Sequence, residues 1–195
     1  MSNTGKQWLF AGVTLALLAG VFVRRVVLPG RTARLHAPRT AQLPRGSPAA
    51  PTAAVPPGEV GTRLPEFHFK DISGREISSE ELRGKIVLID FWATWCAPCK
   101  VEMSGYQILQ ERYGDRGLVV IGLALDTDSA AVSRFAKKLG VNYTLALSTA
   151  EVQQAFGGIL GIPTTILVDR EGIIRQKIIG FEYTEAFESA IKELL

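Results

Sequence analysis

Cysteine and histidine are both scarce in this chain of 195 residues. There are two of each, and His36 and His68 both lie upstream of Cys96 and Cys99. A zinc site needs four ligands, typically a second Cys-x-x-Cys or a histidine pair, and the sequence offers neither, so no metal site is expected. A secreted scaffold would carry several disulfides, and one that closes so short a loop gains little stability. The interpretation that remains for the two cysteines is redox chemistry.

Acidic residues are absent from residues 1–58, which hold seven basic ones. Residues 59–195 therefore carry 15 basic residues against all 19 acidic ones, a formal charge of −4. The excess of positive charge belongs to the N-terminal segment, where a basic tail beside a membrane accounts for it. No basic patch interleaved with aromatic residues occurs, so the sequence predicts no nucleic-acid partner.

The N-terminal segment divides into two parts. Residues 8–23 are uncharged, and an apolar stretch at 26–28 extends them past two arginines to about the length of a membrane span. We predict that residues 1–28 are a membrane anchor inserted through residues 8–28, with a cleaved signal peptide as the alternative. An Ala-x-Ala cleavage site is lacking, as is a cysteine for lipid attachment. Residues 29–58 contain seven prolines and are predicted to form a disordered linker.

The basic residues on either side of the predicted span bear on its orientation in the membrane. Arg24, Arg25, Arg31 and Arg34 follow the apolar stretch, whereas Lys6 precedes it. Taken alone, this bias favours a C-terminal part in the cytoplasm. We nevertheless place the C-terminal part outside the cytoplasm, on the functional grounds given below.

Residues 59–195 are long enough for one domain with its own core. Strand and helix patterns alternate along them, which predicts an α/β fold with a central sheet covered on both faces. The expected elements are a hairpin over 67–77, a buried strand at 86–92, a helix over 96–113, a buried strand at 118–125, a helix over 128–139, a strand at 143–147, a helix over 149–156, a hairpin over 164–179 and a helix over 184–195.

The two cysteines lie where the first buried strand gives way to a helix, in the segment Trp95-Cys96-Ala97-Pro98-Cys99. Backbone N–H groups and the helix dipole stabilise a thiolate at such a place. Cys96 comes first, so we expect it to be the attacking thiolate and Cys99 the resolving thiol, with their disulfide in place of any cofactor. Pro98 falls in the first turn, where its missing N–H costs nothing.

Residues 91–99, followed by Glu102, resemble the active-site segment of thioredoxin-fold proteins, and most closely the membrane-tethered TlpA/ResA-like thiol–disulfide oxidoreductases. Further matching segments lie at 64–67, 74–77, 82–85 and 161–165, so the resemblance covers residues 61–195. It implies a thioredoxin-like fold, a central mixed sheet flanked by helices, with an added N-terminal β-hairpin and a βα insertion. The family commonly continues Glu-x-Pro after the site, whereas this chain has Ser104 there.

Two carboxyl groups accompany the cysteines. Asp90 stands inside an apolar strand, where a lone acid is costly unless it is functional, paired or neutral. Glu102 lies one turn after Cys99 on the same helix face, and is either a solvated residue or a buried acid. Thioredoxin has an Asp at the position of Asp90, and TlpA/ResA-like proteins have an acid at that of Glu102. A buried acid with a raised pKa could take the proton from Cys99.

The resemblance also implies where a substrate binds. Trp95, Ala97 and Pro98 would border Cys96 on the side from which a partner approaches. Pro163 would follow a cis peptide bond, in a loop that packs against the cysteines. The backbone of Ile162 would pair with the bound substrate chain.

The function implied is that of a membrane-anchored reductase of protein disulfides, such as the oxidised haem-binding cysteines of apocytochromes c. Electrons would come from a membrane thiol transporter, and the domain would lie on the extracytoplasmic side of a bacterial inner membrane. A disulfide oxidase or isomerase is an alternative. A copper-delivery module on this fold is another, but it would use a distant histidine, and none follows Cys99. The Pro-x-x-x-Thr-x-x-Cys signature of peroxiredoxins is absent.

Overall fold

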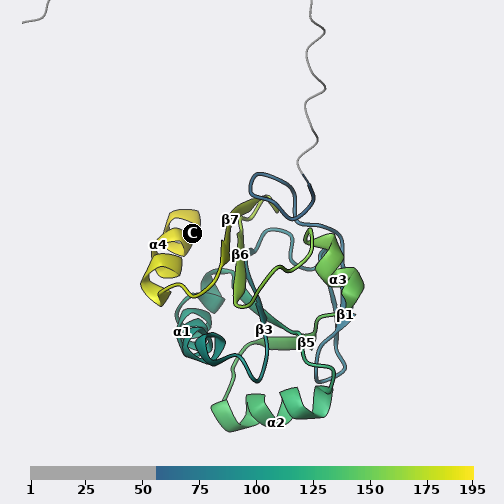
Figure 1. The fold of residues 1–195 in the computed structure, drawn as a ribbon. Coiled ribbons are helices and arrows are strands. Elements are labelled where there is room, and N and C mark those ends of the chain that lie inside the picture. The colour runs from purple at the N-terminus through teal and green to yellow at the C-terminus, as the bar shows by residue number, and fades with distance from the viewer. Residues whose placement is uncertain (1–55) are drawn as a thin grey trace, which may run out of the picture. The chain divides into compact units, whose positions relative to one another are not determined.

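The computed structural model describes residues 56–195, which are built around a five-stranded mixed sheet (Figure 1). Its strand order is β5-β4-β3-β6-β7. The parallel strands are β3 (Ile86–Trp92), β4 (Leu118–Ala124) and β5 (Thr144–Leu147). The strand β6 (Thr164–Val168) lies beside β3 and is antiparallel to it. The strand β7 (Ile174–Ile179) is antiparallel to β6 and so runs in the same direction as β3. The predicted α/β class with a mixed sheet is confirmed.

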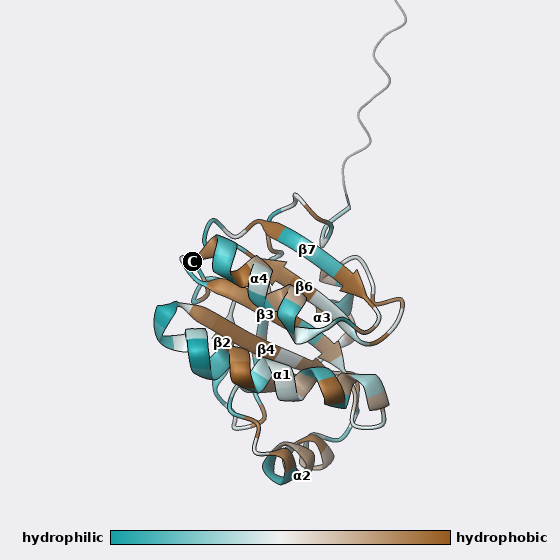
Figure 2. Cartoon of the chain, turned by 90° about the vertical axis from the view of Figure 1, so that its left-hand side faces the viewer, coloured by the Kyte–Doolittle hydropathy of each residue, from teal (hydrophilic) through white to brown (hydrophobic). Residues whose placement is uncertain are grey.

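Strand β3 is the centre of the sheet and of the core. All seven of its residues are buried, and its side chains alternate between two layers because successive residues of a strand point to opposite faces. Apolar residues make up most of β3 and β4 (Figure 2). On one face lie Val87, Ile89 and Phe91, and on the other lie Ile86, Leu88 and Trp92.

Helices cover both faces of the sheet. The helices α1 (Ala97–Tyr113) and α4 (Thr184–Leu194) lie together on one face, and α3 (Ala150–Ala155) lies on the other (Figure 1). The helix α2 (Ser129–Leu139) packs through its buried side chains against a cluster that includes Trp92 and both cysteines. One βα unit, β5 with α3, follows α2 and precedes the β6–β7 hairpin.

The predicted N-terminal hairpin forms a separate two-stranded sheet. Its strands are β1 (His68–Lys70) and β2 (Glu76–Ser78), and Phe69 pairs with Ile77 across them. Both of these side chains are buried in the cluster that also contains Phe91 and Phe156. The hairpin therefore adds its apolar face to the α3 side of the sheet.

The described part of the chain starts just before the domain core. Gly58 is buried against the backbone of Phe156, and the Lys177 Nζ donates a hydrogen bond to Glu59 Oε1 at 2.7 Å. None of the helices within residues 56–195 combines the length and the apolar character that a membrane span needs. The predicted membrane segment, residues 1–28, and the predicted linker up to residue 55 lie outside the described residues.

Candidate active site

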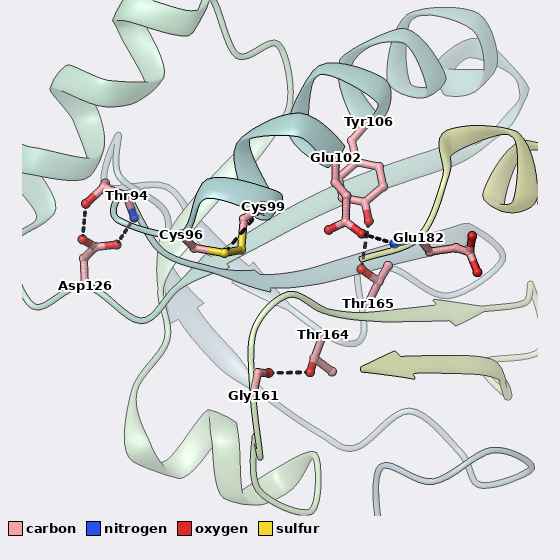
Figure 3. The surroundings of a disulfide bond; sticks show 10 residues. All are labelled: Thr94, Cys96, Cys99, Glu102, Tyr106, Asp126, Gly161, Thr164, Thr165 and Glu182. Carbon is pink, nitrogen blue, oxygen red and sulfur yellow. Dashed lines mark hydrogen bonds between the residues drawn. A yellow bond between two sulfur atoms is a disulfide. The ribbon is translucent and has the colours of Figure 1, made fainter. Parts of the chain in front are cut away.

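The two cysteines form a disulfide at the N-terminus of α1, where β3 has just ended (Figure 3). Cys96 is the N-cap residue, and its Sγ accepts a hydrogen bond from the backbone N–H of Cys99 at 3.3 Å. Pro98 lies in the first turn, as predicted. A negative charge on the Cys96 sulfur would thus face a helix N-terminus, which stabilises the thiolate relative to the thiol.

The surroundings of the disulfide are open on one side only. Cys96 is 5% exposed and Cys99 is fully buried, so a partner can reach only the first sulfur. Trp95 is 70% exposed, and Ala97 and Pro98 are exposed as well. Three of the residues expected to contact substrate therefore border Cys96 on its accessible side.

The loop before β6 lies against the cysteines. The peptide bond between Ile162 and Pro163 is cis, as the resemblance implies. Ile162 packs against the cluster that contains Cys96 and Cys99. The backbone N–H of Gly180 donates to the Pro163 carbonyl at 2.8 Å, which ties this loop to the segment between β7 and α4.

A pair of hydrogen bonds that the sequence analysis missed fixes the segment before Cys96. The Thr94 N–H donates to Asp126 Oδ2 at 2.9 Å, and the Thr94 hydroxyl donates to Asp126 Oδ1 at 2.5 Å (Figure 3). Asp126 follows the end of β4, the neighbour of β3. Functional side chains commonly gather at the carboxyl ends of adjacent parallel strands, so the position of Asp126 carried a usable signal.

Glu102 is a buried acid rather than a solvated helix residue. It is 2% exposed, and its Oε1 accepts a hydrogen bond from the backbone N–H of Glu182 at 2.8 Å (Figure 3). Burial raises the pKa of Glu102 to about 7, with a further contribution from the Glu182 carboxylate, while the hydrogen bond from the Glu182 N–H opposes the shift. No sequence pattern indicated Glu182, because the contact joins residues far apart in the chain.

Asp90 is completely buried, on the face of β3 that α1 covers. Neither of its carboxylate oxygens has a hydrogen-bond partner among residues 56–195. Burial raises the pKa of Asp90 well above its ordinary value, and the charge of Glu102 raises it further. The structure thus places one predicted acid on β3 and the other on α1, and the charge of Glu102 acts on Asp90.

The site contains two sulfur atoms that differ in accessibility and an acid that can accept a proton. Cys96 is accessible and lies where a helix N-terminus stabilises a thiolate, whereas Cys99 is enclosed and is followed one turn later by Glu102, whose pKa is raised. An acid with a pKa of about 7 can both accept and release a proton near neutral pH. Within residues 56–195 no group of three or more His, Cys, Asp or Glu side chains is placed to hold a metal ion.

Known proteins share both the sequence and the fold. The sequence model of the AhpC/TSA family matches residues 60–177. The thiol-disulfide oxidoreductase ResA of Bacillus anthracis is 31% identical over 136 residues, which cover 70% of this chain and 79% of the relative. The thiol:disulfide interchange protein DsbE of Pseudomonas aeruginosa is 32% identical over 129 residues, covering 65% of this chain and 69% of that one. A crystal structure of a thioredoxin-family thiol:disulfide interchange protein from Chlorobium tepidum has a TM-score of 0.65 at 30% identity, covering 70% of this chain and 97% of that one.

Proposed function

Because the chain belongs to the AhpC/TSA family of thioredoxin-like proteins and is a thiol–disulfide oxidoreductase of the ResA and DsbE type, we propose that it works as a reductase of protein disulfides. The direction of electron flow is inferred from two buried carboxyl groups, Asp90 on β3 and Glu102 one turn after Cys99 on α1. Strong oxidants of this fold stabilise their reduced form. Negative charge near the thiols does the opposite, since it disfavours the thiolate and makes the dithiol a better electron donor.

In the proposed reaction, the Cys96 thiolate attacks one sulfur of the substrate disulfide. The substrate S–S bond breaks, one substrate thiolate leaves, and a mixed disulfide with Cys96 remains. The Cys99 thiol then gives its proton to the carboxylate beneath it and attacks the Cys96 sulfur. The second substrate thiolate leaves as the Cys96–Cys99 disulfide forms. The substrate gains two electrons and, after protonation of its thiolates, two protons.

Substrate would bind over the accessible side of Cys96. Trp95 supplies exposed apolar surface there, Ala97 and Pro98 border the sulfur, and the loop with Ile162 and Pro163 lies against the cysteines. A substrate segment could pair with the backbone of Ile162. This arrangement suits an extended polypeptide better than a small thiol, because the contacts extend to both sides of the sulfur.

The cellular setting is part of the same proposal. Residues 8–28 would anchor the protein in a bacterial inner membrane by a single span, with residues 59–195 on the extracytoplasmic side. A membrane thiol transporter would return electrons to the disulfide, and oxidised apocytochrome c would be a substrate. The apolar N-terminal stretch and the resemblance to ResA and DsbE support this setting.

Two measurements test the proposal. Equilibration of the full-length protein with redox buffers should give a reduction potential near about −270 mV, as for thioredoxin, whereas a value near about −120 mV would identify an oxidant. In cells, a Cys99→Ser variant should hold substrate proteins on Cys96 as mixed disulfides. The control is a variant in which Cys96 is also changed to Ser, which should capture none. If the single variant captures no protein either, the proposed substrate class is wrong.

A further inference from the structure

Five buried polar atoms on the α1 side of the sheet have no hydrogen-bond partner among residues 56–195. They are Asp90 Oδ1 and Oδ2, Trp92 Nε1, Glu102 Oε2 and the Tyr143 hydroxyl. An unpartnered buried polar group costs free energy, and a cluster of them needs an explanation such as an ordered water or a function. The reaction proposed above uses the two acids but gives no role to Trp92 or Tyr143.

The strand register explains how these atoms come together. Asp90 and Trp92 are alternate residues of β3, so they share a face, and Gly122 of β4 stands directly opposite Asp90. Gly122 has no side chain, and the Trp92 indole nitrogen lies 2.9 Å from the point that a Cβ there would occupy. The indole N–H therefore lies over Gly122 of β4, the residue that pairs with Asp90.

Tyr143, the residue before β5, supplies the fifth of these unpartnered atoms. It packs against the clusters that contain Trp92 and Tyr106, and its hydroxyl is buried. Burial and the charges of Asp90 and Glu102 raise the pKa of Tyr143, so this hydroxyl stays protonated and can donate a hydrogen bond. Its hydroxyl makes no direct hydrogen bond to either acid, and a water molecule is the group that can connect a buried donor to acceptors it does not touch.

We propose that Asp90 and Glu102 share a single proton across a buried water site, and that Tyr143 is a positioning residue whose hydroxyl donates a hydrogen bond into that site. The inference rests on the proposed function in one respect: the carboxyl group that stays ionised is the one that accepts the proton of Cys99. Three carboxyl oxygens lack partners, and the indole N–H, the tyrosine O–H, the shared proton and the two O–H groups of the water are enough donors to satisfy them.

Repulsion between like charges explains why Asp90 and Glu102 hold one proton between them. Two ionised carboxylates in a site shielded from bulk water repel each other, so one of them takes up a proton. If both were neutral, no acceptor would remain for Cys99. Two acids coupled in this way titrate as a pair, in two steps that belong to the pair rather than to either residue.

Each neighbouring element contributes a group that faces the pair. Tyr106 of α1 also faces Glu102: a hydrogen bond from its hydroxyl lowers the pKa of that carboxyl, while the same oxygen lies 2.8 Å from Thr165 Oγ1 of β6. The Glu182 N–H, from the segment before α4, occupies Glu102 Oε1 and leaves Oε2 for the site. The Glu182 side chain adds a charge that acts on Glu102, and Cys99 lies one turn before Glu102 on α1. Tyr143 carries a buried tyrosine hydroxyl that has no hydrogen-bond partner among residues 56–195, so it can orient the shared proton.

The test replaces Tyr143 with Phe in the full-length protein, which removes one oxygen and keeps the ring. Cys96 is loaded with 5-thio-2-nitrobenzoate, and release of that coloured thiol by Cys99 is timed as a function of pH. Loss of the hydrogen bond to the carboxylate should raise the midpoint of this profile by about one pH unit, which makes release about tenfold slower on its acid side and leaves the alkaline plateau unchanged.

The matched control is Tyr113→Phe, at the mostly buried last residue of α1. The Tyr113 hydroxyl donates to Glu188 Oε1 at 2.6 Å and has no part in the site. Its midpoint should stay at the wild-type value. A Tyr143→Phe profile that superimposes on the wild type, or an equal shift in both variants, would overturn the role of Tyr143. The chemical probe needs no protein substrate, so this result is independent of the test of the reductase function.

Sharing of the proton has its own measurement. Carbon-13 NMR of labelled Asp and Glu carboxyl groups should show two coupled titration steps in the wild-type protein. In Glu102→Gln, the titration of Asp90 should move to lower pH, because the neighbouring charge is gone. If the Asp90 midpoint is the same with and without Glu102, the two acids do not share a proton.

Discussion

Thr94 and Asp126 join the end of β3 to the end of β4 through two hydrogen bonds, 2.9 Å from the Thr94 N–H and 2.5 Å from its hydroxyl. Two residues later comes Cys96, whose own N–H donates to the Ala93 carbonyl at 3.1 Å. The segment that carries the attacking sulfur is therefore fixed to the sheet on both sides of Thr94. Positioning of this kind governs how readily a nucleophile reaches its target.

The first prediction concerns this contact. Asp126→Ala leaves the Thr94 N–H without a partner, so we expect the free energy of unfolding to fall by about 1–3 kcal/mol and alkylation of reduced Cys96 to slow several-fold. The control is Asp128→Ala, which removes the N-cap of α2, where Asp128 Oδ1 accepts from the Ala130 N–H at 2.9 Å. It should cost about 1 kcal/mol and leave the alkylation rate unchanged. Equal rates in the two variants would contradict a positioning role.

The second prediction is a dependence of stability on pH. The pKa of Glu102 is about 7 in the folded protein against 4.5 without the protein's influence, so between these values the folded state binds more protons than the unfolded one. The free energy of unfolding must then fall as pH rises through this interval, by about 3 kcal/mol for Glu102 alone. Asp90, whose pKa is also raised, adds a fall of the same sign.

Urea unfolding of the oxidised protein from pH 4.5 to 8 measures this dependence. Glu102→Gln should remove the part due to Glu102, so the difference between the variant and the wild type should itself change with pH. The control is Glu111→Gln, at an exposed position of α1, which should follow the wild-type profile. Parallel profiles for wild type and Glu102→Gln would show that Glu102 is not a buried acid in solution.

How far the sequence could predict this site depends on the range of the contacts involved. Asp90 was expected to be buried because Ile89 and Phe91 flank it in an apolar strand, and it is. The sequence left Glu102 undecided between a solvated and a buried position. Its burial depends on the segment before α4, about 80 residues away, and no local pattern reports such a contact.

The apolar spacing of α1 was also an incomplete guide. Apolar residues at 101, 103, 108 and 109 have helical spacing, which indicates a helix there, and Met103 and Leu109 are buried in it. Val101 and Ile108, counted in the same pattern, are 61% and 44% exposed. The buried face of α1 instead includes polar residues, Glu102 and Tyr106, because it covers the acids and the hydroxyls of the site. Functional positions are thus where the apolar pattern and the burial diverge.

The third prediction concerns the glycine opposite Asp90. In Gly122→Ala, the new Cβ would approach Leu145 Cδ2 to 2.5 Å and the Trp92 indole nitrogen to 2.9 Å, which is closer than packed atoms allow. Overpacking should lower the free energy of unfolding by about 1–3 kcal/mol. The control is Gly161→Ala, whose Cβ would make an ordinary contact at 3.8 Å and should change stability little. Thermal or urea unfolding that ranks the two variants in the reverse order would contradict the packing described.

The fourth prediction separates the two influences of Glu182 on Glu102. The backbone N–H of Glu182 lowers the pKa of Glu102 by donating to its carboxylate, whereas the Glu182 side-chain charge raises it. Glu182→Gln keeps the N–H and removes the charge, so the carboxyl midpoint of Glu102, measured by carbon-13 NMR, should fall below about 7. Because Glu182 is half-buried and its charge partly screened, we expect a change of about half a pH unit.

A matched variant shows whether this change is local. Glu185→Gln removes an equal charge from the exposed first turn of α4, only three residues further on. It should leave the Glu102 midpoint in place, because water and salt screen a charge at that position. A fall of equal size in both variants would mean that the overall charge of the domain sets the pKa of Glu102. A change confined to Glu182→Gln would mean that the segment between β7 and α4 tunes the acid that serves Cys99, although it contributes no side chain to the sulfur chemistry.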